Sequence, residues 1–157
     1  NIKINILGRY SLTNSKYEFE YFKCFFKKKK FRFIDNYKGR DTYKLIDTYK
    51  YSFTIDSTLG IENLSRGGRT GFFCNRPNKY PLISRKFGWM EGFANKGPFW
   101  TYSNKENEFI RIYKNVIYKN FNYWKNIKKK YTSKIMPYDE KNKIFTKFIK
   151  LSIKKGR

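Results

Sequence analysis

The order of apolar and polar positions predicts strands that alternate with helices over the first half of the chain. Short apolar runs predict strands at residues 2–7, 31–34, 51–55 and 69–74, and segments with helical spacing predict helices at residues 15–28, 41–49 and 57–66. Strands that alternate with helices favour a parallel sheet, because each parallel connection needs a crossover. We therefore expect an α/β fold: a parallel sheet of at least four strands with helices on both faces.

The second half reads as an irregular segment followed by helices. Residues 75–99 contain three prolines and three glycines, and so long an irregular connection is often functional. Helices are predicted at residues 105–119 and 121–131, and a last helix is predicted to begin near residue 139. We expect that last helix to pack through its apolar stripe, which consists of Ile144, Phe145, Phe148, Ile149 and Ile153.

The most informative segment is the polar turn at residues 56–62, between a predicted strand and a predicted helix. Ser57 and Thr58 are favourable N-cap residues, and a helix that starts there directs free N–H groups and its positive dipole end outward. Such an end binds phosphate, and Glu62 is placed to reach a sugar hydroxyl of the same ligand. Asp56 has three possible roles: base, metal ligand, or acceptor for backbone N–H groups of the turn.

Several basic and aromatic residues are candidates to bind the same ligand. Arg76, Arg85 and Lys86 lie in the irregular segment and are candidates to neutralise phosphate. Arg66 and Arg69 are weaker candidates, because a cation near a helix C-terminus often serves the helix dipole. Three aromatic residues could stack on a base or sugar: Trp89, Phe99 and Trp100. For Phe99 and Trp100, core packing is the expected role.

Composition brings in a second class of partner. The 157 residues carry a net charge of +24 at pH 7, which favours anionic partners such as nucleic acid, acidic lipid or phosphorylated substrates. Lysine, asparagine, isoleucine, tyrosine and phenylalanine all have AT-rich codons, so genome composition can supply much of this excess. With 21% aromatic residues, the chain is expected to fold as a single domain over residues 1–157.

The residues that are missing exclude some chemistry. The chain has no histidine, which removes His-based acid–base catalysis and zinc sites with His ligands. Cys24 and Cys74 lie in apolar sequence and are expected to be small buried hydrophobes. No signal peptide or membrane span is visible, so a reducing cytoplasm is the expected location. Because the chain starts without Met, we expect it to be the C-terminal part of a longer protein.

Residues 56–67, with the sequence DSTLGIENLSRG, resemble the DSTLGxExLxRG signature of surface-carbohydrate glycosyltransferases of the GT-B fold. These enzymes belong to capsule and lipopolysaccharide biosynthesis. Two later segments, residues 97–100 and residues 135–139 with Asn142, are similar to the C-terminal part of that group. The resemblance covers about residues 2–149.

The resemblance implies a Rossmann-like, donor-binding C-terminal domain of a two-domain enzyme, whose N-terminal domain would carry the acceptor site. It also implies contacts with the donor. Four residues would face the donor phosphates: Ser57, Thr58, Leu59 and Gly60. Glu62 would bind the ribose. The chain departs from the pattern at Ile61 and Asn63, and neither change removes a donor-contacting group.

Together these observations predict a glycosyltransferase that moves a sugar from a nucleotide-activated donor during surface polysaccharide synthesis. Its expected partners are the donor, a saccharide or lipid-linked acceptor and its own missing domain, with possible contact to an acidic membrane. No metal or other cofactor is required, and no catalytic base is assigned. Two alternatives stay open: a basic module that binds nucleic acid, and an inactive truncated fragment. Exposed aromatics along a continuous basic stripe would favour the first alternative.

Overall fold

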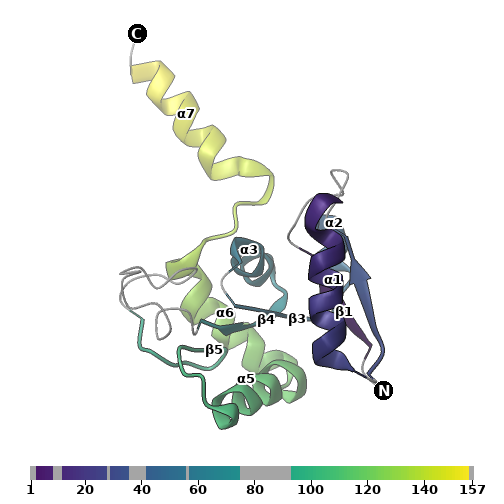
Figure 1. The fold of residues 1–157 in the computed structure, drawn as a ribbon. Coiled ribbons are helices and arrows are strands. Elements are labelled where there is room, and N and C mark those ends of the chain that lie inside the picture. Colours follow the sequence, from purple (N-terminus) through teal and green to yellow (C-terminus); the bar gives the residue numbers. More distant parts are fainter. Residues whose placement is uncertain are drawn as a thin grey trace, which may run out of the picture. The chain divides into compact units, whose positions relative to one another are not determined.

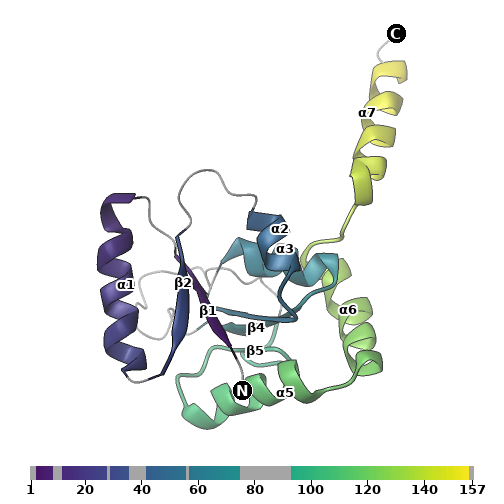
Figure 2. The same ribbon diagram turned by 90° about the vertical axis from the view of Figure 1, so that its right-hand side faces the viewer.

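The computed structural model describes residues 3–8, 12–27, 29–35, 42–55, 57–74 and 93–155. The chain divides into two compact units, unit 1 (Asn1–Ile46) and unit 2 (Asp47–Arg157). Figures 1 and 2 label the elements of both units. Every strand pair between named strands is parallel, so the expected α/β class is confirmed.

Unit 1 is a β-α-β arrangement. Strands β1 (Ile4–Leu7) and β2 (Phe31–Ile34) pair in parallel, and helix α1 (Leu12–Phe26) connects them. The helix packs against β2 through aromatic rings, since the Phe19 centroid lies 5.8 Å from those of Phe31 and Phe33. The other end of α1 is held in the same way, with Phe26 5.1 Å from Phe31. Helix α2 (Thr42–Asp47) follows and ends where unit 2 begins.

Unit 2 contains a three-stranded parallel sheet in the order β3-β4-β5. Its strands are β3 (Tyr51–Thr54), β4 (Arg69–Phe73) and β5 (Trp100–Thr101), and helix α3 (Thr58–Arg66) connects the first two. Among the described residues the strands thus form one sheet of two and one of three, and no single sheet of four is seen. The short strand β5 was not predicted, because its two residues follow a segment rich in proline and glycine.

Helices cover both faces of this second sheet. A Cβ added at Gly60 of α3 would meet the side chains of Thr70 and Phe72, whereas one added at Gly71 would meet Ile112 of α5 (Glu106–Tyr118). Successive strand residues point to opposite faces, so α3 and α5 lie on opposite sides of β4. Figures 1 and 2 show the same arrangement.

The core of unit 2 forms where α3, α5, α6 (Phe121–Ile135) and the sheet meet. Phe99 is fully buried at its centre, and its ring lies 5.0 Å from Trp100, 6.1 Å from Phe72 and 6.0 Å from Trp124. The expected core role of Phe99 and Trp100 is therefore confirmed. Cys74 is also buried, but Cys24 is exposed on α1, so its expected burial is wrong.

The chain ends in a short 3-10 helix, η1 (Glu140–Asn142), and helix α7 (Lys143–Lys155). The Asp139 carboxylate accepts hydrogen bonds from the backbone N–H groups of Ile144 and Phe145 and so caps α7. Every residue from Lys143 to Ile153 is exposed, so the prediction that the apolar stripe of this helix packs into the core is wrong. No helix in the described part of the chain is both long enough and apolar enough to cross a membrane.

Candidate functional site

The candidate anion-binding site is the N-terminus of α3. Ser57 is the N-cap residue, with φ −76° and ψ 132°, and its side chain makes no capping hydrogen bond. Its own N–H donates to Thr54 Oγ1 at 3.1 Å, and the Gly60 N–H donates to the Ser57 carbonyl at 3.0 Å. These two bonds fix the turn while leaving the side chains of Ser57 and Thr58 exposed.

The N–H groups of the first two helical residues, Thr58 and Leu59, are also part of this end. Among the described residues, none accepts a hydrogen bond from either N–H group. The first N–H groups of an α-helix have no partner inside the helix and carry its positive partial charge. An anion at this end would therefore meet two N–H donors and a hydroxyl from Thr58.

Gly60 determines how closely α3 approaches the sheet. A Cβ at this position would lie 2.6 Å from Thr54 Cγ2 and 3.2 Å from the Phe72 ring. Only glycine fits without displacing these neighbours, so the structure supports close helix–strand packing as one role of Gly60. That packing also fixes the N-terminus of α3 directly beyond the C-terminal end of β3.

Glu62 lies on the exposed side of the same helix. Residues four apart share a helix face, so Glu62 stands one turn behind Thr58. Its side chain is half-buried, whereas Ile61 and Leu64 on the other side are buried in the core. The structure thus leaves Ser57 and Thr58 exposed and Glu62 half-buried, on the side of α3 that faces away from the core.

A buried polar network that the sequence did not predict holds α3 in place. The Asn63 side chain is 4% exposed, and its Nδ2 donates to Ser52 Oγ and Thr70 Oγ1, each at 3.0 Å. The two hydroxyls are 2.8 Å apart and also share a hydrogen bond. This network joins α3 to both β3 and β4. No sequence spacing reveals it, because it depends on the register that sets Ser52 opposite Thr70.

The opposite end of α3 carries its own cations. Gly67 ends the helix at φ 114° as the C-cap. Arg66 pairs with Asp47, and Arg69 donates to the Lys119 carbonyl at 2.8 Å. Burial and the neighbouring Arg69 lower the pKa of Lys128. Arg66 is about 12 Å along the helix from its first residue, so these cations complement the α3 C-terminus and do not reach phosphate at its N-terminus.

Two later segments of the resemblance have structural roles. A Cβ at Gly97 would lie about 2 Å from the Trp100 ring, and Arg111 donates to the Gly97 carbonyl at 2.7 Å. Asn115 donates to the Pro98 carbonyl at 2.8 Å. Near the other segment, Ile135 is buried and Asp139 caps α7. These residues thus build the core and the start of a helix.

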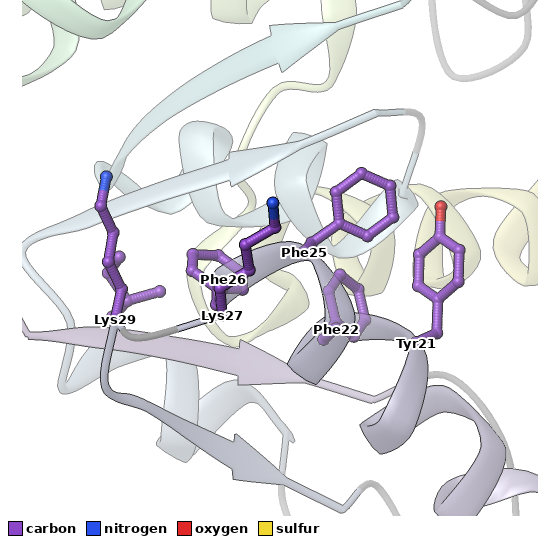
Figure 3. A pocket seen from close by; sticks show the side chains of 7 residues that line it. Tyr21, Phe22, Phe25, Phe26, Lys27 and Lys29 are labelled. Atoms are coloured by element: carbon purple, nitrogen blue, oxygen red, sulfur yellow. The ribbon is translucent and has the colours of Figure 1, made fainter.

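Two open cavities lie elsewhere. In unit 1 an apolar cavity of about 750 Å³ forms between α1 and β1, with Lys27 and Lys29 at its edge (Figure 3). In unit 2 a cavity of about 450 Å³ is lined by aromatic rings and two lysines, among them Tyr131, Lys96 and Lys134. Neither is lined by Ser57, Thr58, Leu59, Gly60 or Glu62.

Some predicted site residues lie outside the described residues. These are Asp56, Arg76, Arg85, Lys86 and Trp89. Their roles stay predictions.

One comparison with known proteins gives a biological context. A family model described as "putative O-antigen biosynthesis protein" matches residues 1–153. Searches of curated proteins and of solved structures found no match. Since the family model spans nearly the whole chain, this protein belongs to that O-antigen biosynthesis family, and its context is the synthesis of surface polysaccharide.

Proposed function

We propose that this chain is the donor-binding part of a glycosyltransferase that uses a nucleotide-activated sugar in O-antigen synthesis. One observation carries the proposal: the N-terminus of α3 lies beyond the end of a parallel strand, with Ser57 and Thr58 exposed and Glu62 half-buried one turn further on. In open α/β sheets, ligands bind outside the carboxyl ends of the strands. The family context supplies a pathway that needs activated sugars.

In this proposal the two units, each built on parallel strands, belong to the Rossmann-like half of a GT-B fold. The β-α-β order of each unit and the helices on both faces of the sheet in unit 2 support that assignment. A further N-terminal domain would supply the acceptor site, and the acceptor would be a saccharide or a lipid-linked saccharide. The reaction would take place in the cytoplasm, at the inner face of the membrane.

The chemical role of α3 follows from charge. As the bond between sugar and phosphate breaks, negative charge grows on the leaving phosphate. The N–H groups of Thr58 and Leu59, in the first turn of α3, would stabilise that charge. The Glu62 carboxylate would accept hydrogen bonds from the ribose hydroxyls. Three basic residues would neutralise the remaining phosphate charge: Arg76, Arg85 and Lys86.

Calorimetry with a panel of nucleoside mono- and diphosphates tests the proposal. We expect the protein to prefer one nucleoside diphosphate, and we expect Glu62→Ala to weaken its binding roughly tenfold, the equivalent of one hydrogen bond to a charged group. Glu106→Ala is the matched control, since Glu106 is exposed in the first turn of a different helix. Equal affinities for wild type and Glu62→Ala, or no nucleotide binding at all, would contradict the assignment.

A further inference from the structure

Helix α7, drawn in yellow in Figure 1, has an apolar face that no core residue covers. Six of its side chains are apolar and exposed, and the fractions range from 40% for Ile149 to 70% for Ile144. They are Ile144, Phe145, Phe148, Ile149, Leu151 and Ile153. Leaving so much apolar surface in water is unfavourable, so this face requires an apolar partner.

The other face of the helix is cationic. At about 100° per residue, Lys143, Lys147 and Lys150 fall within about 60° of arc, and the apolar residues occupy about 200° on the other side. Two polar positions also fall within that wider arc, Ser152 and, at the last residue of the helix, Lys155. The sequence of α7 contains five lysines and no acidic residue. The helix is therefore a strongly amphipathic, purely cationic element.

We propose that α7 docks on an anionic phospholipid bilayer and lies in the plane of its headgroups. Charge selects this occupant. A narrow lysine face opposite a broad apolar face lets the rings enter the acyl boundary while the ammonium groups stay at the headgroups. Thirteen residues give a helix about 20 Å long, shorter than the roughly 30 Å hydrocarbon core, so the helix lies along the surface.

The Asp139 cap gives this element a defined start. The carboxylate of Asp139 accepts N–H bonds from Ile144 at 2.9 Å and Phe145 at 3.1 Å. The helix is thus fixed at the end that joins the rest of the chain, and the residues of its apolar face contribute nothing to the core cluster. Membrane docking through α7 is independent of nucleotide binding, and each can fail without the other.

Flotation of the full chain with lipid vesicles tests this inference. The probes are vesicles of phosphatidylcholine alone and vesicles with about one third phosphatidylglycerol, because anionic lipid attracts basic segments. The matched pair of variants is Phe145→Ser/Phe148→Ser on α7 and Tyr17→Ser/Phe25→Ser on α1. Both pairs remove two exposed aromatic rings and leave the net charge unchanged.

We expect wild type and the α1 variant to float with the anionic vesicles, and the α7 variant to lose binding about tenfold or more. Circular dichroism confirms that each variant is folded. Equal binding of all three proteins would mean that the net charge of +24 alone attracts the vesicles, which overturns the proposal. A second outcome would also overturn the proposal: the wild-type protein is a dimer in lipid-free solution, the α7 variant is a monomer, and the α7 variant still binds vesicles. A second copy of the chain would then cover the apolar face.

Discussion

At the residue scale, the site depends on a few side chains that fix α3 against the sheet. Gly60 allows close contact with Thr54, and the buried Asn63 amide bonds two hydroxyls on neighbouring strands. Gly68 leaves room for the same amide, since a Cβ there would lie 2.3 Å from Asn63 Oδ1. Buried polar groups of this kind are costly to leave unpaired, so Asn63 specifies where α3 sits.

Replacing Asn63 with alanine should therefore destabilise the protein by about 1–3 kcal/mol, because two hydrogen bonds and the packing beside Gly68 are lost. Urea denaturation measures this change. The control is Asn126→Ala, at an exposed position of α6. A midpoint for Asn63→Ala equal to that of the control would show that the network contributes no stability.

At the element scale, the two ends of α3 have different tasks. At its N-terminus no described residue accepts a hydrogen bond from the N–H groups of Thr58 and Leu59. Its C-terminus is capped by Gly67 and lies near Arg66, Arg69 and Lys128. The segment before β5 is attached to α5 by a side chain. Arg111 of α5 donates a hydrogen bond to the carbonyl of Gly97, and its Nη2 lies 2.7 Å from Oε2 of Glu108. These side-chain anchors hold irregular backbone where no long strand does.

The Glu108–Arg111 pair predicts an acid-dependent loss of stability. The hydrogen bond from Arg111 lowers the pKa of Glu108 below its ordinary value of 4.5, against the opposing effect of burial. A carboxyl whose pKa is lower in the folded state adds stability above its unfolded pKa, and that stability is lost as the pH falls through the folded pKa. We expect urea midpoints to fall more steeply below about pH 4.5 for wild type than for Glu108→Gln. Parallel pH profiles would contradict this assignment.

At the scale of the whole molecule, the sequence predicted features that depend on local signals better than features that depend on tertiary packing. The positions of β2 and α3 followed from apolar spacing, Ser57 and Gly67, because caps and periodicity are local signals. The exposed face of α7 and the exposure of Cys24 were not predictable, since spacing shows that a helix is amphipathic but not what covers it. The preference for Arg66 as a cation at the C-terminus of α3 was correct, because its place in the last turn is a local signal.

Over the described part of the molecule, the positive charge is spread and not concentrated on one element. Exposed lysines occur on α1, α2, α5, α6 and α7, that is, in both units. This distribution matches an excess set by composition, and on α7 the lysines oppose a broad exposed apolar face.

The central claim is that the open amides of α3 hold the donor phosphates, and Thr58→Pro tests it most directly. Proline is favoured at the first helical position, so the helix stays intact while the substitution removes the N–H group and the hydroxyl of Thr58. Phe121→Pro makes the same change at the first position of α6. Calorimetry with the preferred nucleoside diphosphate should show about tenfold weaker binding for Thr58→Pro and unchanged binding for Phe121→Pro. Wild-type affinity in the Thr58→Pro protein would contradict the account.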